Sequence, residues 1–154
     1  MSNLDNYAEV NGITICYRTL GSQDNPPLLL IMGLGAQLIS WPKDLLERFS
    51  DEGFFVITFD NRDCGLSSKT EGEPEDSRGL LVQAATGEKV TQKYSLSNMA
   101  LDSVALLNHL GFDAAHIVGA SMGGMIAQTI AIEHPSSVLS LTSIMSATGN
   151  PEEF

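Results

Sequence analysis

The sequence predicts an α/β protein in which strands and helices alternate around a mostly parallel sheet. The continuous apolar run at 27–32 has the length and composition of a strand that is covered on both faces, and a second run, at 54–59, is expected to be the next buried strand. A third run, at 116–119, leads into a serine between two glycines and then into a helical pattern. Because strands that alternate with helical patterns indicate parallel strand-helix units, an α/β architecture follows.

The amino-terminal segment departs from this parallel arrangement. Two β-prone runs, 6–10 and 13–20, are separated by Asn11-Gly12, a dipeptide that strongly favours a tight hairpin turn. The chain is therefore expected to open with two antiparallel strands and to become parallel from 27–32 onwards.

A glycine-containing loop, 32–37, follows the first buried strand. Open α/β sheets place ligands at the carboxyl ends of their strands, so the backbone of this loop is expected to face a substrate. Pro42 fits the first turn of a helix, and Gly53 fits its carboxyl-terminal cap. The next buried strand is expected at 54–59.

Charged residues directly follow the strand at 54–59. Asp60 and Arg62 stand at a strand end, where such residues more often hydrogen-bond a loop and each other than react, so both are interpreted as structural. Residues 69–93 are polar and contain several glycines, which predicts a long surface excursion.

Two further helices and a last strand are expected in the carboxyl-terminal half. Ser95 or Ser97 can cap a helix that runs to Gly111, and a second helix begins at the serine of the glycine motif. This second helix should stop near His134, because a proline follows it. The last strand is expected at 138–145.

The motif Gly119-x-Ser121-x-Gly123 matches the nucleophile elbow, a sharp strand-to-helix turn that holds a serine hydroxyl exposed above a sheet. The turn forces the serine backbone into a strained conformation, and side chains two residues to either side would collide across it. Small residues are therefore required at these two positions, which are Gly119 and Gly123. The serine also begins a helix, so unpaired N–H groups and the positive end of the helix dipole face any anion formed beside it.

Two other interpretations of the motif are open. Gly119-x-Ser121-x-x-Gly124 resembles a degraded dinucleotide-binding fingerprint, but that site needs glycine where Ser121 stands and an acidic residue about 20 positions later. Leu141 and its neighbours are not acidic. The other interpretation is a purely structural turn.

Composition bounds the remaining function classes. The 154 residues suffice for one domain, taken as 1–154. The 8 basic and 19 acidic residues give a net charge of -11, which argues against nucleic acid or an anionic membrane surface as a binding partner. The first residues lack signal-peptide features, and no apolar run is long enough to span a bilayer, so a cytoplasmic location is expected. His109, His116 and His134 lack metal-ligand spacing, and we expect neither a metal nor an organic cofactor.

The order of these signals resembles the α/β-hydrolase fold over the whole chain. The residues that carry the resemblance are the loop Met32-Gly33-Leu34, the loop Asp60-x-Arg62-x-x-Gly65-x-Ser67 and the elbow Gly119-Ala120-Ser121-Met122-Gly123-Gly124. Together with Trp41-Pro42, they look most like the branch that contains aclacinomycin methylesterase. The resemblance implies the amino-terminal portion of this fold, two antiparallel strands and then parallel strand-helix units, ending before the cap and the last strands.

The resemblance implies a serine hydrolase that cleaves a small-molecule carboxylic ester through an acyl-enzyme. Ser121 corresponds to the nucleophile, and the backbone N–H groups of Met122 and of Leu34 or Gly33 correspond to the oxyanion hole. A serine at the elbow favours acyl transfer over the dehalogenase and epoxide-hydrolase chemistry of the same fold. Met32 stands where many relatives carry histidine, which should alter the packing of the loop more than its chemistry.

The triad acid and histidine expected from the resemblance are missing from this chain. In that fold they follow the serine along the chain. His134 is the only histidine after Ser121, and a helical rise of about 1.5 Å per residue puts it roughly 20 Å away. Because a serine hydroxyl needs a positioned base, we expect the chain alone to be inactive or very weak. The alternative function is a non-catalytic ligand-binding domain or an inactive remnant of the same fold.

The strand at 138–145 carries no charge and no proline, and its outer edge is expected to be unpaired within this chain. We expect that edge to pair with a carboxyl-terminal half or with a second copy. The sequence leaves open the substrate, and also whether the chain is a truncation, a proteolytic fragment, one chain of an assembly or a natural remnant.

Overall fold

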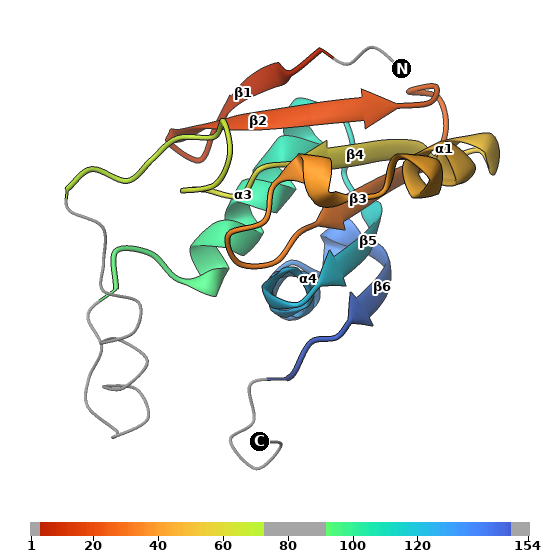
Figure 1. Ribbon diagram of the computed structural model, residues 1–154. Coiled ribbons are helices and arrows are strands. Elements are labelled where there is room, and N and C mark those ends of the chain that lie inside the picture. Colours follow the sequence, from red (N-terminus) through yellow and green to blue (C-terminus); the bar gives the residue numbers. More distant parts are fainter. Residues whose placement is uncertain (1–3, 73–91, 149–154) are drawn as a thin grey trace.

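The computed structural model describes residues 4–72 and 92–148, which form a sheet with helices on both faces (Figure 1). The strands are β1 (Asn6–Val10), β2 (Ile13–Leu20), β3 (Pro27–Ile31), β4 (Phe55–Phe59), β5 (Ala115–Ala120) and β6 (Val138–Ile144). The α-helices are α1 (Lys43–Asp51), α3 (Leu96–His109) and α4 (Met122–Glu133), and two 3-10 turns are η1 (Leu38–Ser40) and η2 (Pro135–Ser137). Within these residues the strands lie in the spatial order β1-β2-β4-β3-β5-β6.

β1 and β2 form the antiparallel hairpin that the dipeptide Asn11-Gly12 predicts. Both turn residues have positive φ, 48° for Asn11 and 77° for Gly12, as a type I′ turn requires. β2 is also antiparallel to β4, whereas β3 is parallel to β4 and β5, and β5 is parallel to β6. The predicted α/β class and the predicted change from antiparallel to parallel pairing are therefore confirmed.

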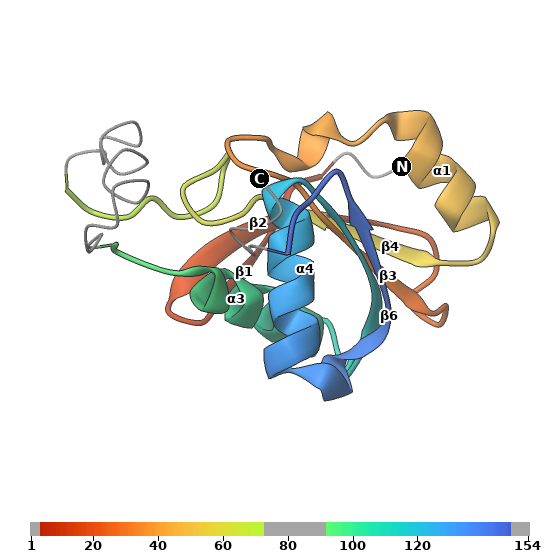
Figure 2. The same ribbon diagram turned by 90° about the horizontal axis from the view of Figure 1, so that it is seen from below.

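Successive residues of β3 face two different apolar clusters. Leu29 packs in a cluster with Ile126 of α4 and with residues of α3. Leu30, the next residue, packs on the opposite face in a cluster with Leu46 of α1. Figure 2 shows α1 on one side of the sheet and α3 and α4 on the other. Because helices cover both faces, every residue of β3 is buried, which explains the uninterrupted apolar run in the sequence.

Capping residues set the helix boundaries, and they decide between Ser95 and Ser97 as the cap of α3. Ser95 rather than Ser97 caps α3, because the Ser95 side chain accepts the N–H of Asn98 in a capping box. The prediction that Pro42 lies inside the first turn of α1 is wrong: its ψ of 129° is extended, so it is the N-cap residue. Gly53 and Gly111 both have a φ of 87° just beyond the ends of their helices, as predicted.

β6 lies at an edge of the sheet. Within the described residues it pairs with β5 alone, and all of its residues except Val138 are exposed. Most of the predicted excursion at 69–93 falls on residues 73–91, which lie outside the described part of the chain. None of the helices in the described ranges is long and apolar enough to cross a membrane.

Candidate active site

Ser121 lies at the sharp turn between β5 and α4 that the glycine motif predicts. Its φ of 55° and ψ of -125° are strained for a residue with a side chain. Both backbone polar groups of Ser121 are hydrogen-bonded: its N–H donates to the carbonyl of Ile144 at 2.9 Å, and its carbonyl accepts the N–H of Gly124 at 2.8 Å. The surrounding structure therefore holds this conformation, while the residue itself stays exposed.

The two elbow glycines are required for different steric reasons. A Cβ on Gly119 would overlap the carbonyl of Gly123, the collision across the turn that the motif predicts. A Cβ on Gly123 would instead overlap the carbonyl of Ile31 in β3. The predicted reason for Gly123 is thus incomplete, because the backbone of the neighbouring strand also excludes a side chain there. α4 begins in direct contact with the backbone of β3.

We expect Gly123→Ala to lower the free energy of unfolding by at least about 3 kcal/mol, because the new methyl group meets a backbone carbonyl that cannot rotate away. Ala131→Ser, a substitution of similar size at a half-buried position of the same helix, should cost less than about 1 kcal/mol. Urea unfolding measures both. Equal effects of the two substitutions would contradict the proposed close contact between α4 and β3.

A cavity of about 430 Å³ opens beside Ser121. Its lining is almost entirely apolar and comes from the ends of β3, β5 and β6 and from the segment before and at the start of α1: Met32, Gly33, Leu34, Ala36, Trp41, Pro42, Leu45, Ala120, Ser121, Ile144 and Met145. A smaller cavity of about 170 Å³ between η1, β2 and β4 contains none of the predicted site residues. The larger cavity is the candidate active site.

The loop after β3 lies against the serine, as the sequence predicts. A Cβ built on Gly33 would lie 3.0 Å from the Ser121 Cβ and 3.3 Å from its Oγ, so a methyl group there would fit only if its neighbours shifted by a few tenths of an ångström. Among the described residues, no hydrogen-bond acceptor takes the backbone N–H of Leu34 or of Met122. Both residues border the serine, Leu34 in the cavity wall and Met122 as the first residue of α4. Two backbone donors are therefore available beside Ser121.

None of the three histidines reaches this cavity. His134 caps the carboxyl end of α4, so the whole helix separates it from Ser121. His116 contacts the Ser140 hydroxyl at 2.7 Å through Nδ1, and His109 packs edge-on against Tyr17. Within the described residues the cavity lining also contains no Asp or Glu. The predicted separation of the histidines from the serine is thus seen in the structure.

Asp60 holds two loops together at this edge of the sheet. Its carboxylate is buried and accepts the backbone N–H of Leu38 at 2.7 Å and of Leu66 at 2.8 Å. Gly65, with a φ of 46°, packs so closely on the carboxylate that a Cβ would overlap it. The predicted structural role of Asp60 agrees with these contacts. The predicted pairing of Asp60 with Arg62 is wrong, because Arg62 turns to a partner on another element.

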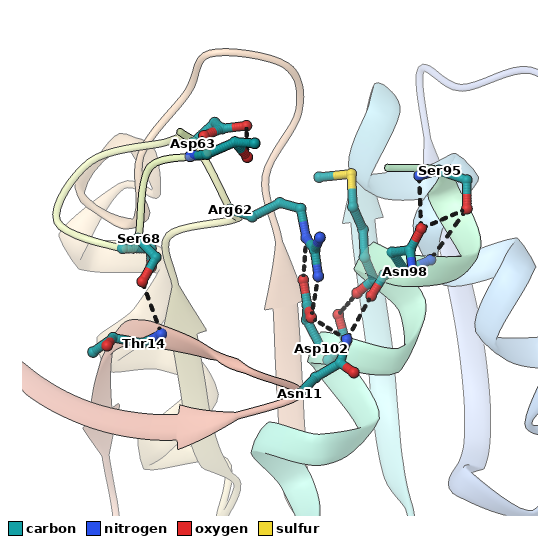
Figure 3. Close-up of polar contacts among 12 residues, drawn as sticks. Asn11, Thr14, Arg62, Asp63, Ser68, Ser95, Asn98 and Asp102 are labelled. Carbon is teal, nitrogen blue, oxygen red and sulfur yellow. Dashed lines mark hydrogen bonds and ion pairs between the residues drawn. The ribbon is translucent and has the colours of Figure 1, made fainter. Parts of the chain in front are cut away.

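That partner is Asp102 of α3 (Figure 3). Arg62 Nε donates to Asp102 Oδ2 and Arg62 Nη2 donates to Oδ1, both at 2.7 Å, and the side chains are only 13% and 2% exposed. Asn11 donates to the same carboxylate at 2.7 Å, and the Arg62 guanidinium lies 5.0 Å from the centre of the Tyr94 ring. The hydrogen bonds to Asp102 raise the pKa of Arg62. The cluster joins the hairpin turn, the loop after β4 and α3.

We expect Arg62→Met to lower the free energy of unfolding by about 3 kcal/mol, because it leaves the buried Asp102 carboxylate without its cation. The double variant Arg62→Met, Asp102→Leu should be more stable than the single variant, since no unpaired charge is then buried. Urea unfolding of both variants tests this. A double variant no more stable than Arg62→Met would show that the unpaired carboxylate is not the cause.

A strained serine at a strand-to-helix turn, above the carboxyl edge of a mostly parallel sheet, defines the class of α/β hydrolases. The family described as alpha/beta hydrolase fold matches residues 26–154, and the chain belongs to this family. The relatives include rhodomycin D methylesterases, which confirms the predicted place in the aclacinomycin methylesterase-like branch.

Three comparisons give the extent of the likeness. The chain is 33% identical over 130 residues to rhodomycin D methylesterase of Streptomyces peucetius, covering 84% of this chain and 38% of that protein. It is 29% identical over 123 residues to 3-oxoadipate enol-lactonase 2 of Acinetobacter baylyi, covering 80% and 38%. Epoxide hydrolase A of Mycobacterium thermoresistibile shares the fold, with a TM-score of 0.74, 21% identity, and coverage of 91% and 38%. The chain thus spans 38% of the length of these relatives.

Proposed function

We propose that this chain is the part of a serine hydrolase that carries the nucleophile Ser121 and the oxyanion hole. In the proposed reaction the Ser121 Oγ attacks the carbonyl carbon of a carboxylic ester and loses its proton to a base. The alcohol leaves with a proton, and water then hydrolyses the acyl-enzyme to release the acid and regenerate the serine. The observation that supports this most is the strained, exposed Ser121 beside a cavity of about 430 Å³.

The proposed oxyanion hole consists of backbone N–H groups of Met122 and of Leu34 or Gly33. Support comes from their position around Ser121 and from the absence of other acceptors for Leu34 and Met122 among the described residues. Met122 also stands at the amino terminus of α4, where the helix dipole favours negative charge. Backbone donors held in place before the reaction stabilise the developing oxyanion without any need to reorganise.

A small, largely apolar ester is the proposed substrate class. The apolar cavity wall favours an apolar group next to the scissile bond, and no charged side chain in the described lining would select a charged one. Two relatives in the comparison are named as a methylesterase and an enol-lactonase, both of which act on ester bonds. A serine nucleophile fits ester cleavage better than epoxide or carbon-halogen cleavage, which the same fold performs with aspartate at this position.

The catalytic base that accepts the Ser121 proton, and the carboxylate that orients this base, are proposed to come from residues outside 4–72 and 92–148. The 154-residue chain alone should therefore turn over esters weakly, at the level of about 10³ to 10⁴ over water that an oxyanion hole and binding can leave. The alternative function is a ligand-binding domain without turnover, which the same apolar cavity would also serve.

Labelling with a fluorophosphonate probe separates these functions. In the complete polypeptide, or with any second chain that co-purifies, the probe should attach to Ser121, as located by mass spectrometry of the labelled peptide. A complete, folded assembly that is not labelled at Ser121 would leave the non-catalytic alternative. Binding of a nicotinamide or flavin nucleotide in place of labelling would favour the dinucleotide interpretation of Gly119-x-Ser121-x-x-Gly124.

A further inference from the structure

A buried amide holds the loop that borders Ser121. Asn61, which directly follows Asp60 in the loop after β4, is 2% exposed and donates its Nδ2 to the backbone carbonyl of Met32 at 2.9 Å. Met32 lies directly before Gly33, the residue packed on Ser121. β3 and β4 are parallel neighbours, so their carboxyl ends meet at one edge and bring Asn61 to this loop.

The carbonyl of Met32 belongs to the same peptide unit as the N–H of Gly33. A peptide unit is planar and, when trans, directs its C=O and N–H to opposite sides. The structure contains no cis peptide in the described residues, so a hydrogen bond that fixes the Met32 carbonyl also fixes the direction of the Gly33 N–H. Asn61 thereby sets the start of the loop that carries the proposed oxyanion donors.

The loop is fixed at its other end and from behind as well. The Asp60 carboxylate accepts the Leu38 N–H at 2.7 Å. The consecutive side chains of Asp60 and Asn61 therefore hydrogen-bond the two ends of the segment from Met32 to Leu38. Gly123 of α4 packs behind the loop, where a Cβ would come within 2.8 Å of the Met32 carbonyl. Asp60 and Asn61 directly follow the last residue of β4, so the sheet holds the backbone that carries both side chains.

We propose that Asn61 is a positioning residue for the oxyanion hole: its amide orients the Met32–Gly33 peptide so that the loop presents its N–H groups to the oxyanion. This inference rests on the proposed function. Asn61 does not line the cavity, so it acts through the loop and not on the substrate. Its loss should therefore lower kcat and leave KM nearly unchanged, since donors aimed at the transition state contribute little to binding of the ground state.

The test uses the complete polypeptide and a p-nitrophenyl ester. Asn61→Leu keeps the approximate size of the side chain but cannot donate, and kcat should fall about 10- to 100-fold with KM changed less than about threefold. Asn61→Asp adds a pH signature, because a protonated carboxyl can donate to the Met32 carbonyl and an ionised carboxylate cannot. The ratio of Asn61→Asp to wild-type kcat should therefore rise as the pH falls. Asn108→Asp adds the same charge on the exposed face of α3 and should show no such trend.

Amide hydrogen exchange at Ala36, whose N–H donates to the Gly33 carbonyl at 3.2 Å within this loop, gives a second readout that does not require activity. Exchange should be faster in Asn61→Leu than in wild type, with exchange in α3 unchanged. An active wild type with an Asn61→Leu variant within about twofold of its kcat would overturn the role of Asn61 and leave the proposed function intact. If wild type is neither labelled at Ser121 nor active, the proposed function fails. Exchange alone then decides whether Asn61 positions the loop: faster exchange supports it, and unchanged exchange overturns it.

Discussion

Replacing Ser121 with alanine should lower ester hydrolysis by the complete polypeptide at least about 10⁴-fold and abolish fluorophosphonate labelling. The variant loses the nucleophile, whereas the apolar cavity and the backbone donors beside it remain. Residual activity should therefore stay above the uncatalysed rate. Because alanine also has a side chain, the strain of a φ of 55° remains, and stability should change little.

Ser136→Ala is the matched control for this prediction. Ser136 is exposed in η2, at the end of α4 away from Ser121, so its loss should leave kcat and labelling unchanged. The two variants are compared by steady-state hydrolysis of a p-nitrophenyl ester and by thermal unfolding. If Ser121→Ala retained more than about a tenth of wild-type kcat while folded, another residue would be the nucleophile.

The fold could be predicted from the sequence because each of its elements has a local cause. The hairpin follows from a dipeptide that tolerates positive φ, and the buried strands follow from runs that helices cover on both faces. The elbow follows from two glycines and a serine, since few sequences tolerate that turn. The start of α1 was predicted wrongly, because proline favours the first helical position, whereas Pro42 has an extended ψ and is the N-cap residue.

Parts of the site with no local signature could not be predicted in the same way. The buried partner of Arg62 lies on α3, and only the tertiary structure brings Asp102 to it. The contact of Asn61 with the Met32 carbonyl likewise depends on the pairing of β3 with β4. Ile144 and Met145 in the cavity wall stand at the carboxyl end of β6, where ligands of open α/β sheets are expected, so this signal could have identified them.

The free edge of β6 should make the 154-residue chain self-associate. In the described part of the chain β6 pairs with β5 alone, so a row of N–H and C=O groups on its other side has no strand partner. The strand Val138–Ile144 contains no charged residue and no proline, the two devices that most often keep an edge from pairing. Exposed apolar side chains add to this tendency, namely Leu139, Leu141, Ile144 and Met145. We propose that a carboxyl-terminal half or a second copy occupies this edge.

Leu139→Lys should reduce the association, because a lysine at an edge strand would have to be desolvated when another strand pairs there. Ile132→Lys is the matched control: Ile132 is 78% exposed against 55% for Leu139, but it lies on α4 and not in the edge strand. Sedimentation velocity at about 10 to 100 micromolar should show oligomers for wild type and for Ile132→Lys, and mainly monomer for Leu139→Lys. A wild-type chain that is monomeric over this range, with slow amide exchange along Val138–Ile144, would mean that the edge is protected within the chain itself. Association that both lysines reduce equally would indicate general apolar attraction rather than pairing through β6.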